Sequence, residues 1–123
     1  MKKFILTVAI LLATGINAMA EGAESNEMNR VEAYDVEVNI NGLARYLELT
    51  DDQIDGVESI QNVFSESLKY AASIKNDESR KKMVRNTISY DLRNMKYILT
   101  EEQYKKYRKV LNATLENRNI DWK

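Results

Sequence analysis

Hydrophobic residues recur three or four positions apart along the second half of the chain, and this spacing predicts three amphipathic helices. An α-helix gathers residues with this spacing on one face, which can then be buried. The expected core residues are Ile54, Val57, Ile60, Phe64, Leu68 and Ala71 in the first of these helices, Val84, Ile88, Leu92, Met95 and Leu99 in the second, and Tyr104, Tyr107, Leu111 and Leu115 in the third. The chain contains no proline that would break the three stretches.

A different pattern precedes these helices. Val36, Val38 and Ile40 alternate with polar residues, which is typical of a strand, but the chain offers no second strand to pair with it. The residues before them are polar, acidic and without a period. We therefore expect residues 21–40 to form a disordered or extended leader.

The predicted helical domain covers residues 41–118. It begins with a short helix over 41–48 that buries Leu43 and Leu47, and the three longer antiparallel helices follow. Residues 119–123 are expected to form a C-terminal tail. The predicted fold class is all-α, and 103 residues after an N-terminal signal are enough for one domain with a modest core.

One five-residue motif, Leu-Thr-x-x-Gln, occurs twice, fifty positions apart. Its defining residues are Leu49, Thr50 and Gln53 in the first copy and Leu99, Thr100 and Gln103 in the second. A threonine at the N-cap accepts a hydrogen bond from the amide three residues on, and a glutamine there reaches back to the threonine amide, which completes a capping box. Acidic residues in between favour the positive end of the helix dipole. The motif predicts two helix starts.

The paired motifs and the helices between them resemble the Spy/CpxP family of small exported bacterial helical proteins, over residues 43–115. Residues 112–118 are also similar to the ending of uncharacterised small exported proteins that share the motif. Members of the Spy/CpxP family are ATP-independent periplasmic chaperones or envelope-stress regulators, built as thin, curved antiparallel dimers. The resemblance implies a thin helical hairpin or cradle, a homodimer, and binding of unfolded or partly folded proteins or of an envelope sensor.

The first twenty residues have the three regions of a secretory signal peptide. Lys2 and Lys3 precede an apolar run over 4–13, and the small-residue sequence Ala-Met-Ala ends at Ala20. A transmembrane helix is the alternative, but the apolar run is too short for a hydrocarbon core of about 30 Å. We expect cleavage after Ala20, a periplasmic or secreted location, and no transmembrane segment in the mature chain.

The two central helices each carry a second apolar stripe, on the side away from the expected core face. These stripes consist of Val63, Tyr70 and Ile74 on one helix and Met83, Tyr90 and Tyr97 on the next. Either the outer helices cover both sides, or the second stripes form an exposed surface for a client or a second protomer.

A basic row also flanks the core stripe of the later helix, at Lys82, Arg85, Arg93 and Lys96. It is either a solvated rim or part of a surface that binds unfolded or acidic segments.

Charge is distributed unevenly along the chain. Residues 21–60 contain 11 acidic and 2 basic side chains, whereas residues 61–123 contain 8 acidic and 14 basic ones. The two halves could attract each other within the fold or across a dimer, or the basic half could provide a binding surface.

The chemistry of common enzymes is missing. The chain has no histidine and no cysteine, and it has no glycine-rich loop of the kind that holds phosphate. We therefore expect no enzyme, no cofactor and no metal site. The basic and aromatic stretch over 104–109 is not expected to bind nucleic acid, because Tyr104 and Tyr107 fall on the core face.

These patterns lead to one hypothesis and one alternative. The hypothesis is an exported, non-enzymatic helical binding protein that holds unfolded or partly folded clients. The alternative is a structural or regulatory adaptor with one dedicated envelope partner.

Overall fold

Five helices and no strand occur in residues 26–123, the part of the chain that the computed structural model describes. They are α2 (Asn26–Tyr34), α3 (Ile40–Leu47), α4 (Asp51–Ala72), α5 (Asp77–Ile98) and α6 (Glu101–Asn117). The predicted all-α class is confirmed, with a short helix followed by three longer ones. The predicted signal peptide, residues 1–20, lies outside the described residues.

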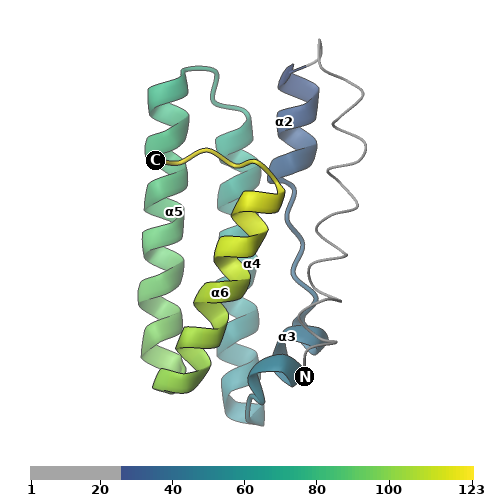
Figure 1. Cartoon of the computed structure of the whole chain (residues 1–123), viewed down its shortest axis with the longest axis vertical. Coiled ribbons are helices and arrows are strands. Elements are labelled where there is room, and N and C mark those ends of the chain that lie inside the picture. Colours follow the sequence, from purple (N-terminus) through teal and green to yellow (C-terminus); the bar gives the residue numbers. More distant parts are fainter. Residues whose placement is uncertain (1–25) are drawn as a thin grey trace.

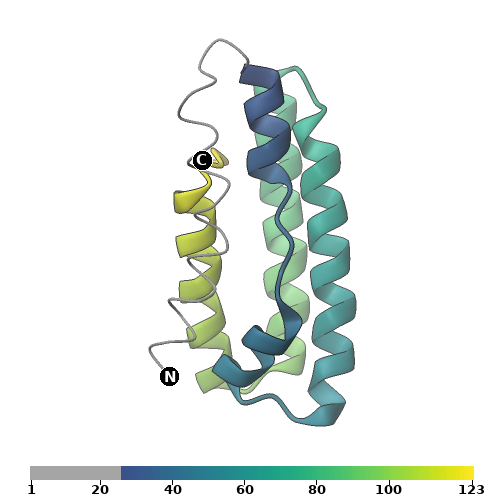
Figure 2. The same ribbon diagram turned by 90° about the vertical axis from the view of Figure 1, so that its right-hand side faces the viewer.

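The three long helices α4, α5 and α6 run side by side in alternating directions (Figure 1). A column formed by α2, the extended segment 35–39 and α3 runs along them and contacts both α4 and α6 (Figure 2). The bundle therefore consists of the three long helices and this column, and its core lies between them. Among residues 26–123, no helix has both the length and the apolar character needed to cross a bilayer.

The expectation of a disordered or extended leader over 21–40 is wrong for residues 26–34, which form α2. Ala33 and Tyr34 are buried at its C-terminal end, and α2 packs along α4. Of the described residues of this leader, 35–39 are extended, and there the alternation has a simple cause, since Val36 is buried while Glu37 is exposed. Packing against the long helices, which local sequence cannot specify, orders this part of the chain.

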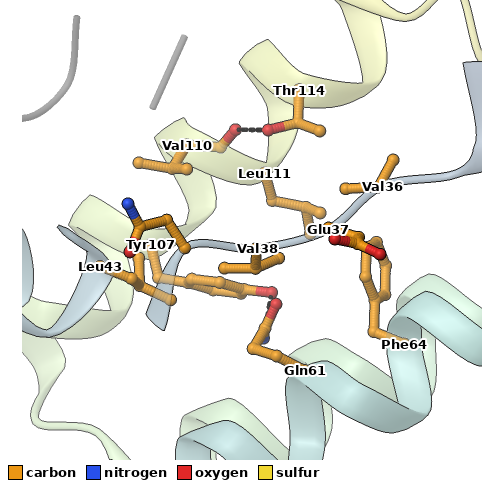
Figure 3. A pocket seen from close by; sticks show the side chains of 11 residues that line it. Val36, Glu37, Val38, Leu43, Gln61, Phe64, Tyr107, Val110, Leu111 and Thr114 are labelled. Carbon is orange, nitrogen blue, oxygen red and sulfur yellow. Dashed lines mark hydrogen bonds between the residues drawn. The ribbon is translucent and has the colours of Figure 1, made fainter. Parts of the chain in front are cut away.

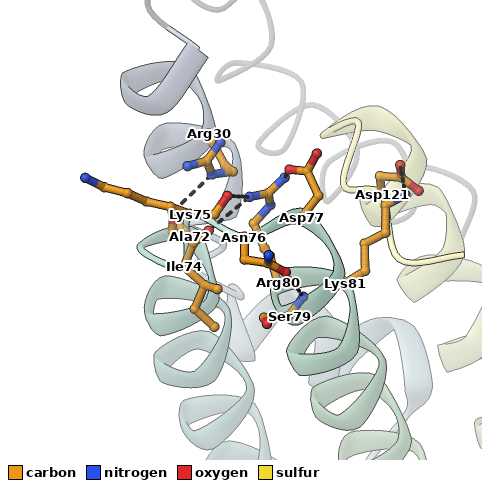
Figure 4. A network of polar contacts seen from close by, with 10 residues as sticks. All are labelled: Arg30, Ala72, Ile74, Lys75, Asn76, Asp77, Ser79, Arg80, Lys81 and Asp121. Carbon is orange, nitrogen blue, oxygen red and sulfur yellow. Dashed lines mark hydrogen bonds and ion pairs between the residues drawn. The ribbon is translucent and has the colours of Figure 1, made fainter.

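Arginine side chains attach α2 to the rest of the bundle. Arg118, at the end of α6, donates from Nη1 to the carbonyl oxygens of Glu32 and Ala33, at 3.1 and 3.5 Å. Arg30 donates from Nε to the carbonyl of Ala72, the last residue of α4, at 3.1 Å (Figure 4). Both arginines satisfy carbonyl groups that a helix end leaves without an intrahelical partner.

The turn between α4 and α5 is held by its own polar residues. Asn76 caps α5, because its side-chain oxygen accepts from the amide of Ser79 at 2.8 Å. Arg80 reaches back across the turn, donating to the carbonyl of Ile74 at 2.9 Å and pairing with Asp77 (Figure 4). The α4–α5 hairpin is thus closed at this end.

The C-terminal residues are part of the fold, so the core extends beyond the predicted boundaries 41–118 at both ends. Asn119 has a positive φ of 54° and turns the chain after α6 toward α5 (Figure 1). Ile120 is buried, and Asp121 pairs with Lys81 at 3.3 Å. The segment predicted to be a tail therefore covers one side of the bundle.

Candidate binding surface

Both predicted capping boxes are formed. Thr50 accepts at Oγ1 from the amide of Gln53 at 3.3 Å, and the Gln53 side-chain oxygen accepts from the amide of Thr50 at 2.9 Å. The second copy repeats this geometry between Thr100 and Gln103, at 3.2 and 2.9 Å. The two motifs therefore start α4 and α6, as the sequence indicates.

The two motif glutamines also bind each other, which sequence reasoning missed. Gln53 Nε2 donates to Gln103 Oε1 at 2.8 Å, and Gln103 Nε2 donates to Gln53 Oε1 at 3.2 Å. Gln53 further donates to the carbonyl of Ile98 at the end of α5, and Gln103 to that of Leu47 at the end of α3. A glutamate at either position would complete the capping box but could not donate. The presence of glutamine rather than glutamate in both copies of the motif was therefore the sequence signal for this side-chain contact.

A cluster of three polar side chains lies inside the bundle. Asp91 of α5 is 1 % exposed, and its carboxylate accepts from the hydroxyl of Tyr107 on α6 and from Gln61 Nε2 on α4, the latter at 3.1 Å. Gln61 also donates to the Tyr107 hydroxyl at 2.9 Å. The cluster joins the three long helices, and no charged group balances the carboxylate within it.

Burial controls the protonation of this cluster. Desolvation raises the pKa of Asp91 to about 7, although the hydrogen bonds from Tyr107 and Gln61 act in the opposite direction. Burial also raises the pKa of Tyr107 well above its usual value, and the neighbouring Asp91 carboxylate adds to this shift. Since the carboxyl group is enclosed by the helices, a substrate has no direct access to it.

A sequence signal for the cluster was present. Asp91 continues the three-and-four spacing of Val84, Ile88 and Met95, and Gln61 continues that of its own helix. A polar residue in a core register is normally buried with a partner. Neither residue was among the predicted site residues.

A small pocket lies beside the polar cluster, beneath the extended segment (Figure 3). Its walls include Val36 and Val38 from that segment and Gln61 and Tyr107 from the long helices. The cavity volume is about 30 Å³, which is room for a molecule of the size of water. The pocket is therefore too small for an organic ligand.

The second apolar stripes are exposed in large part. The exposed fractions are 44 % for Val63, 63 % for Tyr70, 48 % for Tyr90 and 89 % for Tyr97. Within residues 26–123, the interpretation that outer helices cover both sides of the central pair is wrong, because the α2–α3 column and α6 leave the outer side of the α4–α5 pair uncovered there (Figures 1 and 2). We call this outer side the open face, defined by Val63, Tyr70, Met83, Tyr90 and Tyr97.

The open face is grooved at its middle. Val63, Met83 and Tyr90 border a shallow groove of about 290 Å³ between α4 and α5, with Phe64 and Thr87 among its other lining residues. Three of the six predicted stripe residues therefore share one depression. Ile74 is half-buried at the α4–α5 turn instead.

The basic row does not line the groove. Its four residues, Lys82, Arg85, Arg93 and Lys96, are all exposed. At 100° per residue they lie toward the edge of α5 opposite to Met83 and Tyr90. Arg85 is engaged by the C-terminal segment, donating to the carbonyl of Trp122 at 3.1 Å. The basic row therefore lies along one edge of the open face and outside the groove.

The described part of the chain is an all-α bundle in which the open face is an exposed apolar surface. Comparison with known proteins adds no further assignment, since no family model, no curated protein and no solved structure matches the chain.

Proposed function

We propose that this chain is an exported, non-enzymatic binding protein that holds unfolded or partly folded proteins on the open face. One observation carries the proposal. Four of the five large apolar residues that are strongly exposed among the described residues lie on this face, the fifth being Val31 on α2. Aligned exposed apolar residues of this kind mark interaction surfaces.

The side chains of the open face suit variable partners. Tyrosine provides a large contact area at a low cost in conformational entropy, and its hydroxyl tolerates water. Methionine, here Met83, adapts its shape to different partners. The resemblance to ATP-independent chaperones of the Spy/CpxP type supports the same conclusion.

A client assay tests the proposal. The purified protein should suppress the light scattering of a chemically denatured model client at stoichiometric ratios. The double variant Tyr90→Ser/Tyr97→Ser should lose most of this effect while remaining folded. Val31→Ser is the matched control, because it removes an exposed apolar residue outside the open face. Equal suppression by all three proteins, or none by the unaltered one, would overturn the proposal.

The groove favours a second candidate function, that of an adaptor for one envelope partner. A depression bordered by Val63, Met83 and Tyr90 suits one inserted side chain better than many different ones. Affinity capture from an envelope extract separates the two functions. One stoichiometric partner lost in Val63→Ser would favour the adaptor, and a broad set of partners would favour the chaperone.

A further inference from the structure

The extended segment 35–39 has the pattern of a β-strand but pairs with no strand among residues 26–123. Val36 is buried and Glu37 is exposed, as in a strand that is covered on one side. The segment lies between α4 and α6, and together with both helices it lines the small pocket (Figure 3). Its two backbone edges therefore face different neighbours.

One edge of the segment is held by α4. Ser65 on α4 donates from Oγ to the carbonyl oxygen of Val36 at 2.6 Å. In a strand, the N–H and C=O groups of one residue point to the same edge, and those of the next residue point to the opposite edge. The N–H and C=O groups of Glu37 therefore point away from α4 and toward α6.

The edge that faces α6 is unpaired. It presents the C=O of Asp35, the N–H and C=O of Glu37 and the N–H of Asn39. None of these backbone groups has a hydrogen-bond partner among the described residues. A depression of about 480 Å³ lies beside them, lined by the segment and by Arg118 at the end of α6. An unpaired edge next to free space is a template for a strand from another chain.

The exposed charges along this edge are acidic. Asp35 and Glu37 are exposed, and Glu37 forms no ion pair with another described residue. Asp35 lies 3.6 Å from the Nζ atom of Lys69, in an exposed pair with α4. Arg118 is 7 % exposed and donates to two carbonyl groups at the end of α2. The edge therefore favours an incoming strand with basic side chains.

We propose that an extended segment of another protein, with alternating basic and small residues, docks as an antiparallel strand on this edge. Antiparallel pairing lets Glu37 exchange both backbone hydrogen bonds with one residue of the partner. Residues directly opposite each other share one side of the pair, so this partner residue lies beside the Glu37 carboxylate and is a lysine or arginine. The residues next to it point inward over the small pocket, which has room for a methyl group such as that of alanine.

Two occupants from this chain itself suit the edge less well. A second copy paired through the same segment would set Glu37 opposite Glu37 or Asp35, and like charges directly opposite destabilise a strand pair. Residues 21–25 contain two glutamates and no basic residue. Charge complementarity therefore favours a basic segment of another protein.

The strand site is separate from the open face. The α2–α3 column and α6 pack on one side of the α4–α5 hairpin, and the open face is its other side (Figure 2). The proposed strand site therefore goes beyond the client function and does not depend on it.

Fluorescence anisotropy of a labelled, capped peptide of sequence Ala-Lys-Ala-Lys-Ala tests the docking to the exported protein. We expect saturable binding that Glu37→Lys weakens about ten-fold, because an attraction becomes a repulsion. Glu116→Lys is the matched control and should leave the affinity unchanged, since Glu116 is exposed and lines a different depression, beside the C-terminal segment.

Methylated peptides test the backbone pairing itself. The lysine N–H groups point toward the segment and the alanine N–H groups point away from it. Methylation of both lysine amide nitrogens should weaken binding about ten-fold, because it keeps the charges but removes the donors. Methylation of the central alanine amide is the matched control and should have little effect.

Absence of saturable binding, equal affinity of Glu37→Lys, or equal losses from the two methylated peptides would each overturn the proposal. Self-association that Glu37→Pro abolishes, measured by sedimentation equilibrium, would assign the edge to a second copy and overturn it as well. The variant Tyr90→Ser/Tyr97→Ser should bind the peptide normally. Loss of peptide binding in this variant would place the peptide on the open face, whereas loss of client suppression alone would leave the strand site supported.

Discussion

The side-chain amides of Gln53 and Gln103 donate to one another, with Nε2–Oε1 distances of 2.8 and 3.2 Å. Each amide also completes a capping box and donates to the last turn of another helix. The starts of α4 and α6 and the ends of α3 and α5 are therefore joined in one hydrogen-bonded unit. Two motifs that are local in sequence cooperate across fifty residues.

Removing either glutamine should cost more than a cap alone. We expect Gln53→Ala and Gln103→Ala each to lower the free energy of unfolding by about 1–2 kcal/mol, because each substitution removes one donor and one acceptor from the remaining glutamine side chain. The double variant should lose less than the sum of the single losses, by about 1 kcal/mol. Urea titrations of the four proteins measure this coupling, and strict additivity would contradict the pairing.

The threonine caps should each contribute a smaller amount. Thr50→Ala and Thr100→Ala are each expected to lower the free energy of unfolding by about 1 kcal/mol, since the backbone N–H groups of Gln53 and Gln103 lose the threonine hydroxyls that accept from them. Serine keeps the hydroxyl and is the control at both positions. Chemical denaturation decides the matter, and an alanine variant as stable as its serine counterpart would count against the caps.

Stability should depend on pH through Asp91. Its carboxyl pKa is about 7 in the folded protein against 3.8 in the unfolded chain. The folded state therefore binds more protons between these values, and its stability rises as pH falls from about 7 toward 4. The full gain is at most about 4 kcal/mol, at 1.36 kcal/mol per pKa unit.

Asp91→Asn isolates this effect, because asparagine is uncharged at every pH. The variant should be more stable than the unaltered protein at pH 8, and the difference should shrink as the pH falls. Urea midpoints measured at pH 4.5, 6 and 8 give the comparison. Parallel pH profiles for the two proteins would show that the buried carboxyl is not the titrating group.

Tyr107→Phe removes a hydrogen bond that lowers the pKa of Asp91. This variant should therefore move the pH-dependent change in stability to higher pH.

Tyrosines on the open face and in the core should respond differently to the same substitution. Tyr97→Ser should change the free energy of unfolding by less than about 0.5 kcal/mol, since that side chain is 89 % exposed. Tyr46→Ser should cost about 3 kcal/mol or more, since Tyr46 is 4 % exposed. Thermal unfolding compares the two variants. A large loss in Tyr97→Ser would mean that Tyr97 is covered in the folded protein.

The C-terminal segment should be required for full stability. Ile120→Ala is expected to lower the free energy of unfolding by about 2–3 kcal/mol, because Ile120 is buried against the core. Asp121→Asn removes only an exposed ion pair with Lys81 and should cost less than about 1 kcal/mol. Equal stability of both variants in urea would mean that residues 119–123 are a dispensable tail.

The sequence by itself determined the features that depend on neighbouring residues. The three long helices, both capping boxes and the Asn76 cap follow from spacings of three or four residues and from hydrogen bonds within one turn. The core stripes follow in large part, since Val57, Leu68, Val84, Met95 and Leu111 are buried, whereas the predicted core residues Ile54, Ile60, Leu92 and Tyr104 are only half-buried. The second stripes were also visible, but two interpretations of them stayed open.

Only the tertiary structure decided the features that depend on residues far apart in the chain. The helix α2 and the buried Ile120 have weak local signals and are ordered by packing against helices distant in sequence. The meeting of Asp91 with Tyr107 requires α5 and α6 to be antiparallel neighbours. The open face exists because α6 and the α2–α3 column all pack on one side of the α4–α5 hairpin. Periodicity shows that a helix has two apolar sides, but only packing determines which one is covered.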